Sequence, residues 1–275
     1  MSTHARRRGF TIIELLISMM IVAVIGASLT RLIVAQSRFY DRQNLQKSAR
    51  DVSRAALNIM QSDLRMVEET QGVRAASATS VELRVPVAVG YACNQTTIHL
   101  LPVDSALMAE ALPQIEGIAL REMATDAYDS WTGSSTLTPT TTANCTAANV
   151  GTLPGGQTYT TASLSSWDFP GQPAMVYRKI TYRIAASTMV PGSLGLWRRI
   201  GNGTDEELVA PLTSASGFTY YRLNSSVPGA APGTLAEVYG IRVRLVGASE
   251  RGDQANGRVQ QADLVTSIYF KNRKV

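Results

Sequence analysis

The N-terminal region places a single carboxylate in an otherwise apolar stretch. The 21 residues from Phe10 to Thr30 contain one ionisable side chain, that of Glu14. A charged group near the centre of a bilayer costs roughly 2.5–3.5 kcal/mol on insertion scales, and such groups are usually functional. Glu14 therefore calls for a cationic partner, and charge pairing inside an apolar environment is the first chemistry that the sequence predicts.

The stretch has the length and the flanks of a membrane-spanning helix. About 20 apolar residues are needed to cross a hydrocarbon layer of about 30 Å. Arg6, Arg7 and Arg8 precede the stretch, so the positive-inside rule predicts a cytoplasmic N-terminus and an exported remainder. A secretory signal peptide has a shorter apolar region. A plain signal anchor has the right length but gives no reason for Glu14.

The same segment carries a resemblance to a known family. The run Arg8-Gly9-Phe10-Thr11-Ile12-Ile13-Glu14-Leu15-Leu16 resembles the prepilin signature of type IV pilins and type II secretion pseudopilins. The resemblance implies that residues 1–9 are a leader, with Arg6, Arg7 and Arg8 as its charges. It also implies cleavage by a prepilin peptidase between Gly9 and Phe10, N-methylation of Phe10, and a role for Glu14 in assembly.

Cleavage would create the cation that Glu14 needs. The new ammonium group of Phe10 can pair with Glu14 of a neighbouring subunit, which would fix the axial register between two helices. It can also pair within its own helix, because residues four apart are neighbours. In either case the low dielectric strengthens the attraction.

The helical pattern continues past the apolar stretch. Residues 31–69 contain neither proline nor glycine. Their apolar residues follow helical spacing: Leu45, Ala49, Val52, Ala56, Met60, Leu64 and Val67. We expect one helix over residues 10–70, with a transmembrane half at 10–30 and an amphipathic half at 31–71 that packs on the chain's own head; a coiled coil is the alternative. Gly72 is suited to a left-handed C-cap.

Beyond Gly72 the apolar residues recur with period two. Val81, Leu83, Val85, Val87 and Val89 are predicted to share one face of a strand. Similar alternation at residues 180–184, 241–245 and 264–270, together with an apolar run at 218–222, indicates further strands. The predicted fold class is α+β: a long N-terminal helix packed on an antiparallel β-sheet head at residues 72–275, the ladle shape of pilins.

A Thr- and Ser-rich segment interrupts this pattern near residues 130–166, and we expect it to be a surface insertion. Cys145 lies inside it, and Cys93 follows a predicted strand. Outside the cytoplasm the two cysteines can form a disulfide worth on the order of 4 kcal/mol. Two free thiols are the alternative.

The sequence gives little support to catalysis or to bound cofactors. Among the two histidines, His4 lies in the leader and His99 lies in an apolar context that favours a structural role. Residues 250–257 lack the alternating acidic ligands of a calcium loop and are predicted to form a hairpin tip. Residues 205–207 are predicted to form a turn. We expect no enzyme activity, no cofactor and no metal site.

Nucleic-acid binding is also weakly supported. The net charge of +5 falls by three, to +2, without Arg6, Arg7 and Arg8. Tyr220 and Tyr221, next to Arg222, could stack on bases, but their pattern favours packing within a strand.

The head adds a looser resemblance over residues 175–273. Its segments look like those of PilW-type minor pilins and GspJ-type minor pseudopilins: residues 177–184, 195–199, 208–212, 218–221 and 268–273. This resemblance implies a minor pilin that helps initiate or cap a type IV pilus. The alternatives are a minor pseudopilin of a type II secretion system and a tip adhesin or DNA-capturing pilin. The class of anchored enzymes has little support.

The implied partners are other minor and major pilins, the prepilin peptidase, the inner-membrane assembly platform and membrane lipid. The implied location is a single-pass inner-membrane state with a periplasmic head, followed by a pilus filament or pseudopilus. The sequence leaves open which of these machines the chain serves.

Overall fold

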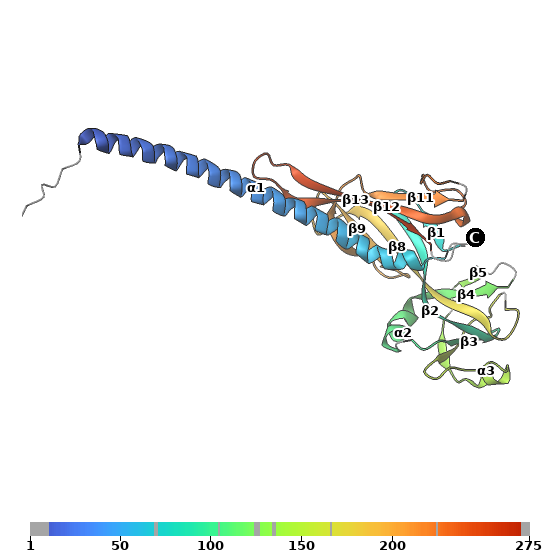
Figure 1. Cartoon of the computed structure of the whole chain (residues 1–275). Helices are drawn as coiled ribbons and strands as arrows, with labels where there is room; N and C mark the ends of the chain where they lie inside the picture. The colour runs from blue at the N-terminus through green and yellow to red at the C-terminus, as the bar shows by residue number, and fades with distance from the viewer. Residues whose placement is uncertain are drawn as a thin grey trace, which may run out of the picture.

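The structure is a computed structural model that describes residues 11–68, 71–103, 105–123, 127–133, 136–165, 167–223 and 225–270. Its elements are α1 (Ile12–Met66), β1 (Val73–Ala76), β2 (Ser80–Asn94), β3 (Thr97–Leu100), α2 (Ser105–Ala111), η1 (Leu112–Gln114), β4 (Ile115–Glu122), β5 (Ala127–Gly133), β6 (Thr138–Thr140), α3 (Ala143–Ala147), β7 (Gln157–Thr160), β8 (Gln172–Ala186), β9 (Leu194–Ile200), β10 (Glu206–Leu212), β11 (Gly217–Arg222), η2 (Leu235–Glu237), β12 (Val238–Gly252) and β13 (Val259–Tyr269). The α+β class is confirmed: one long N-terminal helix leads into an antiparallel sheet (Figure 1).

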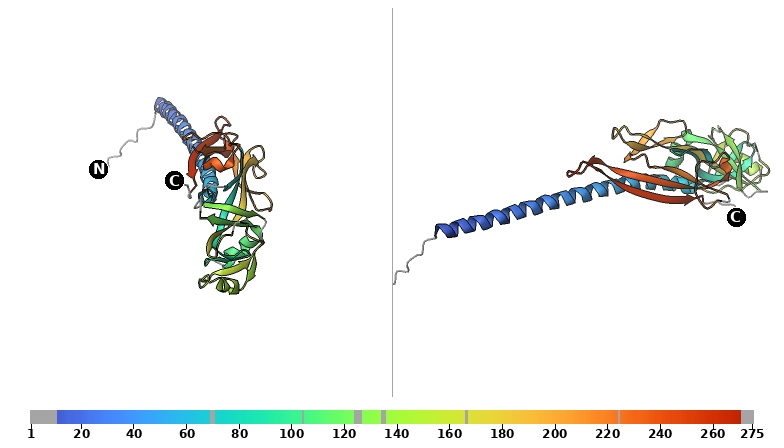
Figure 2. Two further views of the ribbon diagram at one scale, coloured as in Figure 1. Left: turned by 90° about the vertical axis from the view of Figure 1, so that its right-hand side faces the viewer. Right: turned by 90° about the horizontal axis from the view of Figure 1, so that it is seen from above.

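Helix α1 has 55 residues, which gives a length of about 80 Å at 1.5 Å per residue. Its N-terminal half projects away from the head, and its C-terminal half lies against the sheet (Figure 1, Figure 2). The helix stops at Met66, before the predicted end at residue 70, because Val67 already has extended backbone angles.

The prediction that Gly72 is a left-handed cap is wrong. Gln71 is the residue with a positive φ, 56°. Gly72 is needed for a different reason, since a Cβ there would lie 2.1 Å from the carbonyl oxygen of Glu68. The chain therefore turns directly back over the helix end, and only a residue without a side chain permits that approach.

The amphipathic half of α1 packs on the chain's own head, as predicted. Its buried residues are Leu45, Ala49, Ser53, Ala56, Met60 and Leu64. They differ from the predicted stripe at one step, where Ser53 is buried and Val52 is only half-buried. The polar Ser53 therefore occupies the buried position that the apolar pattern assigned to Val52.

The sheet is antiparallel in every described strand pair. Its main path runs β11-β12-β10-β9-β8-β2-β3-β7-β6, with β1 paired to β2, β13 paired to β12, and β4 paired to both β8 and β5. Strands β2 and β8 pair along their length, from Ser80↔Arg183 to Ala92↔Gln172. These two long strands form the continuous connection between the two ends of the head.

The predicted alternation in β2 fails in its second half. Val81, Leu83 and Val85 are buried, but Val89 is 43% exposed and Ala88 is buried instead. The pairing with β8 shifts between Pro86 and Ala88. One extra residue at this bulge moves the buried face from odd to even positions.

The head contains two main cores. The first packs α1 against β1, the first half of β2, the second half of β8, and strands β9 to β13. The second lies at the other end of β2 and β8, between strands β3, β4 and β7 and helix α2. We call the described part of residues 87–176 the distal lobe, which lies at the C-terminal end of α1 (Figure 1).

The Thr-rich segment near residues 130–166 is part of this lobe, and most of its described residues are exposed, but it also contains regular secondary structure. The segment includes β6, α3 and β7. Tyr159, Leu137 and Leu164 from it are buried in the second core. Its many threonines fit strands, because β-branched side chains pack well on a pleated surface.

Candidate assembly site

The start of α1 is capped by a residue next to the lone carboxylate. Thr11 has extended backbone angles, and its hydroxyl oxygen accepts a hydrogen bond from the Glu14 amide at 3.3 Å. The spacing Thr-x-x-Glu is that of a capping box, and a carboxylate in the first turn is favoured by the helix dipole. The bond to Thr11 uses the main-chain amide of Glu14 and not its carboxylate. The spacing of Thr11 and Glu14 in the sequence indicates this cap.

The other polar side chains of the apolar half are satisfied within the helix. Ser18, Ser28 and Thr30 donate to the carbonyl oxygens of Leu15, Val24 and Gly26 at 2.9, 2.8 and 2.9 Å, respectively. Among the described residues, nothing forms a hydrogen bond or ion pair with the Glu14 carboxylate. Glu14 thus stands apart from the rest of the segment as a charge that is free to bind another group.

The apolar half of α1 is uncovered in the single chain. Its large side chains are exposed, from Ile12 at 83% to Ile33 at 63%. Among the described residues, α1 is the one helix that is long and apolar enough to cross a membrane. The segment therefore needs either lipid or other apolar helices around it.

Some of the predicted site residues lie outside the described residues. These are Arg6, Arg7, Arg8, Gly9 and Phe10. The cleavage position, the methylation of Phe10 and the pairing of its amino group with Glu14 remain predictions.

The covered half of α1 is fixed to the sheet by a hydroxyl inserted into a strand pair. Ser53 Oγ accepts from the Gly247 amide at 2.9 Å, and the carbonyl oxygens of Ala262 and Ala49, at 3.0 and 3.2 Å, share its one proton. Gly247 and Ala262 are opposite residues of β12 and β13. A Cβ on Gly247 would lie 2.2 Å from the Ala49 carbonyl oxygen, so glycine is required for helix and strand to meet here. Sequence patterns did not identify this contact, because a lone serine and a lone glycine carry no periodic signal.

A tyrosine makes a second polar connection between helix and sheet. The buried Tyr182 on β8 donates its hydroxyl proton to Asp63 Oδ2 at 2.6 Å. Burial, followed by the nearby Asp63 charge, raises the pKa of Tyr182 far above its usual range. The phenol therefore stays protonated and keeps donating to the helix at all physiological pH values.

The tip of the β12–β13 hairpin contacts α1 close to its exposed half. Arg251 donates to Asp41 Oδ1, and the Gln254 amide donates to Asp41 Oδ2 at 3.2 Å. The hydrogen bond from Arg251 is the main cause that lowers the pKa of Asp41. Arg42 Nε lies 3.6 Å from the buried carboxylate of Asp253. These pairs hold the hairpin along the helix (Figure 2).

The same contacts agree with the prediction of a hairpin tip at residues 250–257. Asp253 Oδ1 accepts from the amides of Ala255 and Asn256 at 2.9 and 2.8 Å. Among the described residues, no group of three or more His, Cys, Asp or Glu side chains is placed to hold a metal ion.

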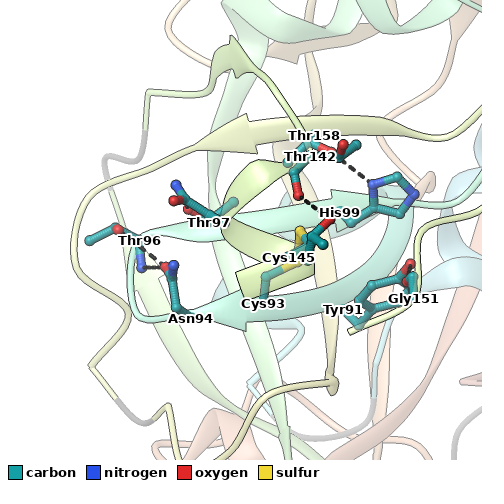
Figure 3. The surroundings of a disulfide bond; sticks show 12 residues. Tyr91, Cys93, Asn94, Thr96, Thr97, His99, Thr142, Cys145, Gly151 and Thr158 are labelled. Atoms are coloured by element: carbon teal, nitrogen blue, oxygen red, sulfur yellow. Dashed lines mark hydrogen bonds between the residues drawn. A yellow bond between two sulfur atoms is a disulfide. The ribbon is translucent and has the colours of Figure 1, made fainter. Parts of the chain in front are cut away.

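The distal lobe contains the disulfide and the histidine that the sequence singled out (Figure 3). Cys93 on β2 and Cys145 on α3 are bonded. His99 is fully buried; its Nε2 accepts from the Leu153 amide at 3.2 Å, and its Nδ1 lies 2.8 Å from Thr158 Oγ1. Both ring nitrogens are thus engaged with the surrounding segment, and burial lowers the pKa of His99. The histidine is structural.

The remaining candidates are also explained by packing and pairing. Tyr220 is buried, and its hydroxyl donates to the Ser77 carbonyl oxygen at 2.8 Å. The side-chain hydroxyl oxygens of Tyr221 and Ser267 are hydrogen-bonded at 2.7 Å. The turn predicted at residues 205–207 is wrong, because Glu206 and Glu207 already lie in β10. Asp205 pairs with Arg183 at 2.7 Å, and Glu206 pairs with Arg198 at 3.0 Å. These groups stabilise the sheet.

Comparison with known proteins agrees with the N-terminal assignment. Residues 4–30 match the model of the prokaryotic N-terminal methylation motif. Neither a curated protein nor a solved structure matches the chain significantly. The motif and the helix-plus-sheet architecture together support a type IV pilin-like or pseudopilin-like protein.

Proposed function

We propose that the protein is a minor pilin of the PilW kind that helps initiate or cap the assembly of a type IV pilus after cleavage between Gly9 and Phe10. The observation that supports this most is the contrast along α1. Its C-terminal half is bound to the head, whereas its apolar N-terminal half is exposed and carries the Glu14 carboxylate, which has no partner within residues 11–68 or the described part of the head. The exposed half of such a helix needs either lipid or other apolar helices around it.

In this proposal the chain first spans the inner membrane, with its head in the periplasm. Prepilin peptidase removes residues 1–9, and the methylated amino group of Phe10 stays cationic. The helix then leaves the bilayer through the assembly platform and packs against the helices of other minor and major pilins. Pairing of Phe10 with a neighbour's Glu14 sets the register, because Glu14 is the one ionisable group in the apolar stretch. No catalytic step is assigned to the chain.

The distal lobe favours a place at the leading end of the filament. It lies at the end of the head farthest from the exposed half of α1 (Figure 1). When that half points toward the membrane, the lobe is the part held farthest from the bilayer. A subunit in the interior would have to accommodate the lobe against the heads in front of it, whereas a leading subunit has none in front.

The experiment is a Glu14→Ala substitution in cells that contain the matching assembly machinery. The variant should insert and be cleaved normally, because an apolar residue costs less in the membrane. Its incorporation into sheared filaments should fall about tenfold or more, since one buried pair is lost. Ser18→Ala is the matched control, because Ser18 bonds only to its own helix. Wild-type incorporation of the Glu14 variant would refute the register pairing.

A further inference from the structure

Strand β13 forms a long open edge of the sheet. Its eleven residues pair with β12, and no other described strand pairs with it. The hairpin that contains it runs back along α1 (Figure 1, Figure 2). An open edge of this length is a template for pairing with another chain.

The hydrogen-bond pattern shows which main-chain groups face outward. The Phe270 amide donates to the Tyr239 carbonyl oxygen across the ladder, and Ala262 faces Gly247 through Ser53. Even-numbered residues from 262 to 270 therefore bond toward β12. In an antiparallel pair the alternate residues point the other way. The amides and carbonyls of Gln261, Asp263, Val265, Ser267 and Tyr269 consequently face the open edge, and none of them has a hydrogen bond among the described residues.

Sequence features that usually protect an edge are scarce on β13. Val259–Tyr269 contains no proline and no lysine. Its single charge, Asp263, is neutralised by Arg244 at 2.6 Å. Val265 and Tyr269 are 41% and 53% exposed on the face away from α1. The edge therefore combines free main-chain groups with apolar side chains that an added strand could cover.

A basic groove lies beside this edge. It has a volume of about 350 Å³ and is lined by Gln46, Arg50, Ser53 and Arg54 of α1 and by residues 261–264 of β13, which include the Arg244-paired Asp263. Arg50 and Arg54 are exposed and have no ion-pair partner among the described residues. They lie one helical turn apart, about 6 Å along the axis. Alternate side chains of a strand repeat every 6.6–6.8 Å or so, so two carboxylates two positions apart match the two guanidinium groups.

We propose that the open edge of β13 and the Arg50–Arg54 groove form a docking site for an extended segment of another protein with acidic residues at alternate positions. The segment pairs its main chain with Gln261–Tyr269, places its carboxylates over Arg50 and Arg54, and covers Val265 and Tyr269 with its other face. A second copy of this chain does not fit, because symmetric β13–β13 pairing would bring four of these arginines together. The proposal is independent of the assigned role in filament assembly.

The test uses the processed full chain in neutral detergent and a fluorescent peptide, Thr-Glu-Val-Glu-Thr-Thr-Val-Thr-Thr. The matched peptides replace both Glu by Gln or N-methylate alternate amides. The acidic peptide should bind, and each matched peptide should bind with a Kd that is higher by about tenfold or more. Binding should also slow hydrogen exchange at Gln261–Tyr269. Equal binding of the acidic and Gln peptides, or binding of none, overturns the proposal.

Variants of the chain provide the second arm. Val265→Pro removes an outward-facing amide while leaving the bonds to β12 intact, and it should abolish binding, whereas Val265→Thr should retain it. Arg50→Glu with Arg54→Glu should also abolish binding, whereas Arg38→Glu, on the same helix outside the groove, should not. If Val265→Pro disturbs folding, the N-methylated peptide tests the same main-chain bonds on the unaltered protein. Concentration-dependent self-association that Val265→Pro abolishes would contradict the proposed occupant and indicate a second copy instead.

Discussion

Ser53 links helix and sheet through one hydroxyl that satisfies two main-chain groups. Gly247 and Ala262 are opposite residues of the β12–β13 ladder, and the Ser53 hydroxyl adds a side-chain hydrogen bond from α1 to this pair. The contact therefore fixes where α1 crosses β12 and β13, and with it the direction in which the exposed half of α1 leaves the head.

Replacing Ser53 with alanine should destabilise this junction by about 1 kcal/mol, because the side-chain hydrogen bond between α1 and the strand pair is lost. The opening free energies of β12 amides, measured by hydrogen exchange on the full chain, would show the loss. Ser62→Ala is the control, since the exposed Ser62 bonds only to Ile59 of its own helix. Equal effects of the two substitutions would show that the bridge contributes nothing.

His99 should make the stability of the distal lobe depend on pH. Burial lowers the pKa of His99 from 6.5, so the unfolded chain binds the proton more readily than the folded one. The stabilising effect of the neutral ring is thus present above about pH 6.5 and is lost as the pH falls below it, by at most about 1.4 kcal/mol per pH unit.

The measurement is the opening free energy of β3 and β7 amides at about pH 7.5 and 5.5, corrected for the intrinsic pH dependence of exchange. The wild-type value should fall at the lower pH, and His99→Gln should flatten the dependence. A wild-type lobe that is equally stable at both pH values would contradict a neutral, structurally required His99.

Residues with periodic signals could be predicted, and isolated polar contacts could not. Leu45, Ala49 and Met60 were placed correctly because the helical repeat forces them onto one face. Ser53 and Gly247 were missed, because their roles exist only after two segments far apart in sequence meet. The capping role of Thr11 can be read from its spacing to Glu14.

At the scale of elements, the strands were predictable in type but not always in phase. The face of β13 formed by Leu264, Thr266, Ile268 and Phe270 is turned inward as expected. In β2 the bulge after Pro86 exchanges the buried and exposed positions, and no local sequence pattern indicates it. The strands of the Thr-rich segment were not predictable, because its composition suggests loops, whereas β7 pairs with β3, far upstream, as well as with β6.

The disulfide belongs to this scale, because it joins α3 to the end of β2. Replacing Cys93 and Cys145 together by serine should destabilise the distal lobe by on the order of 4 kcal/mol in the chain-entropy model. The core under α1 contains neither cysteine and should keep its stability. Hydrogen exchange of β7 and β12 amides in one experiment compares the two lobes directly. An equal loss in both would show that they unfold as one unit rather than separately.

At the scale of the whole molecule, the two ends of the elongated structure differ. One end is an apolar half-helix that the head leaves uncovered; the other is a disulfide-bonded lobe held away from it (Figure 1). The long strands β2 and β8 and the covered half of α1 connect these ends. The long helix and the sheet followed from sequence periodicity, whereas the division into two lobes depended on long-range pairing.

Removal of the leader can be tested at position 9. A bulkier residue at position 9, as in Gly9→Val, should block removal of the leader, because the peptidase is expected to cut after that glycine. The full-length chain should then accumulate in the membrane and stay out of filaments. Normal cleavage of this variant would place the processing site elsewhere.

The most direct measurement is mass spectrometry of the N-terminal peptide of the wild-type membrane form, from cells with an active prepilin peptidase. The account predicts a chain that begins at Phe10 and carries one methyl group on its amino nitrogen, four residues before Glu14. A chain that still begins at Met1 would leave Glu14 without its proposed cation and would make the protein an ordinary membrane-anchored one.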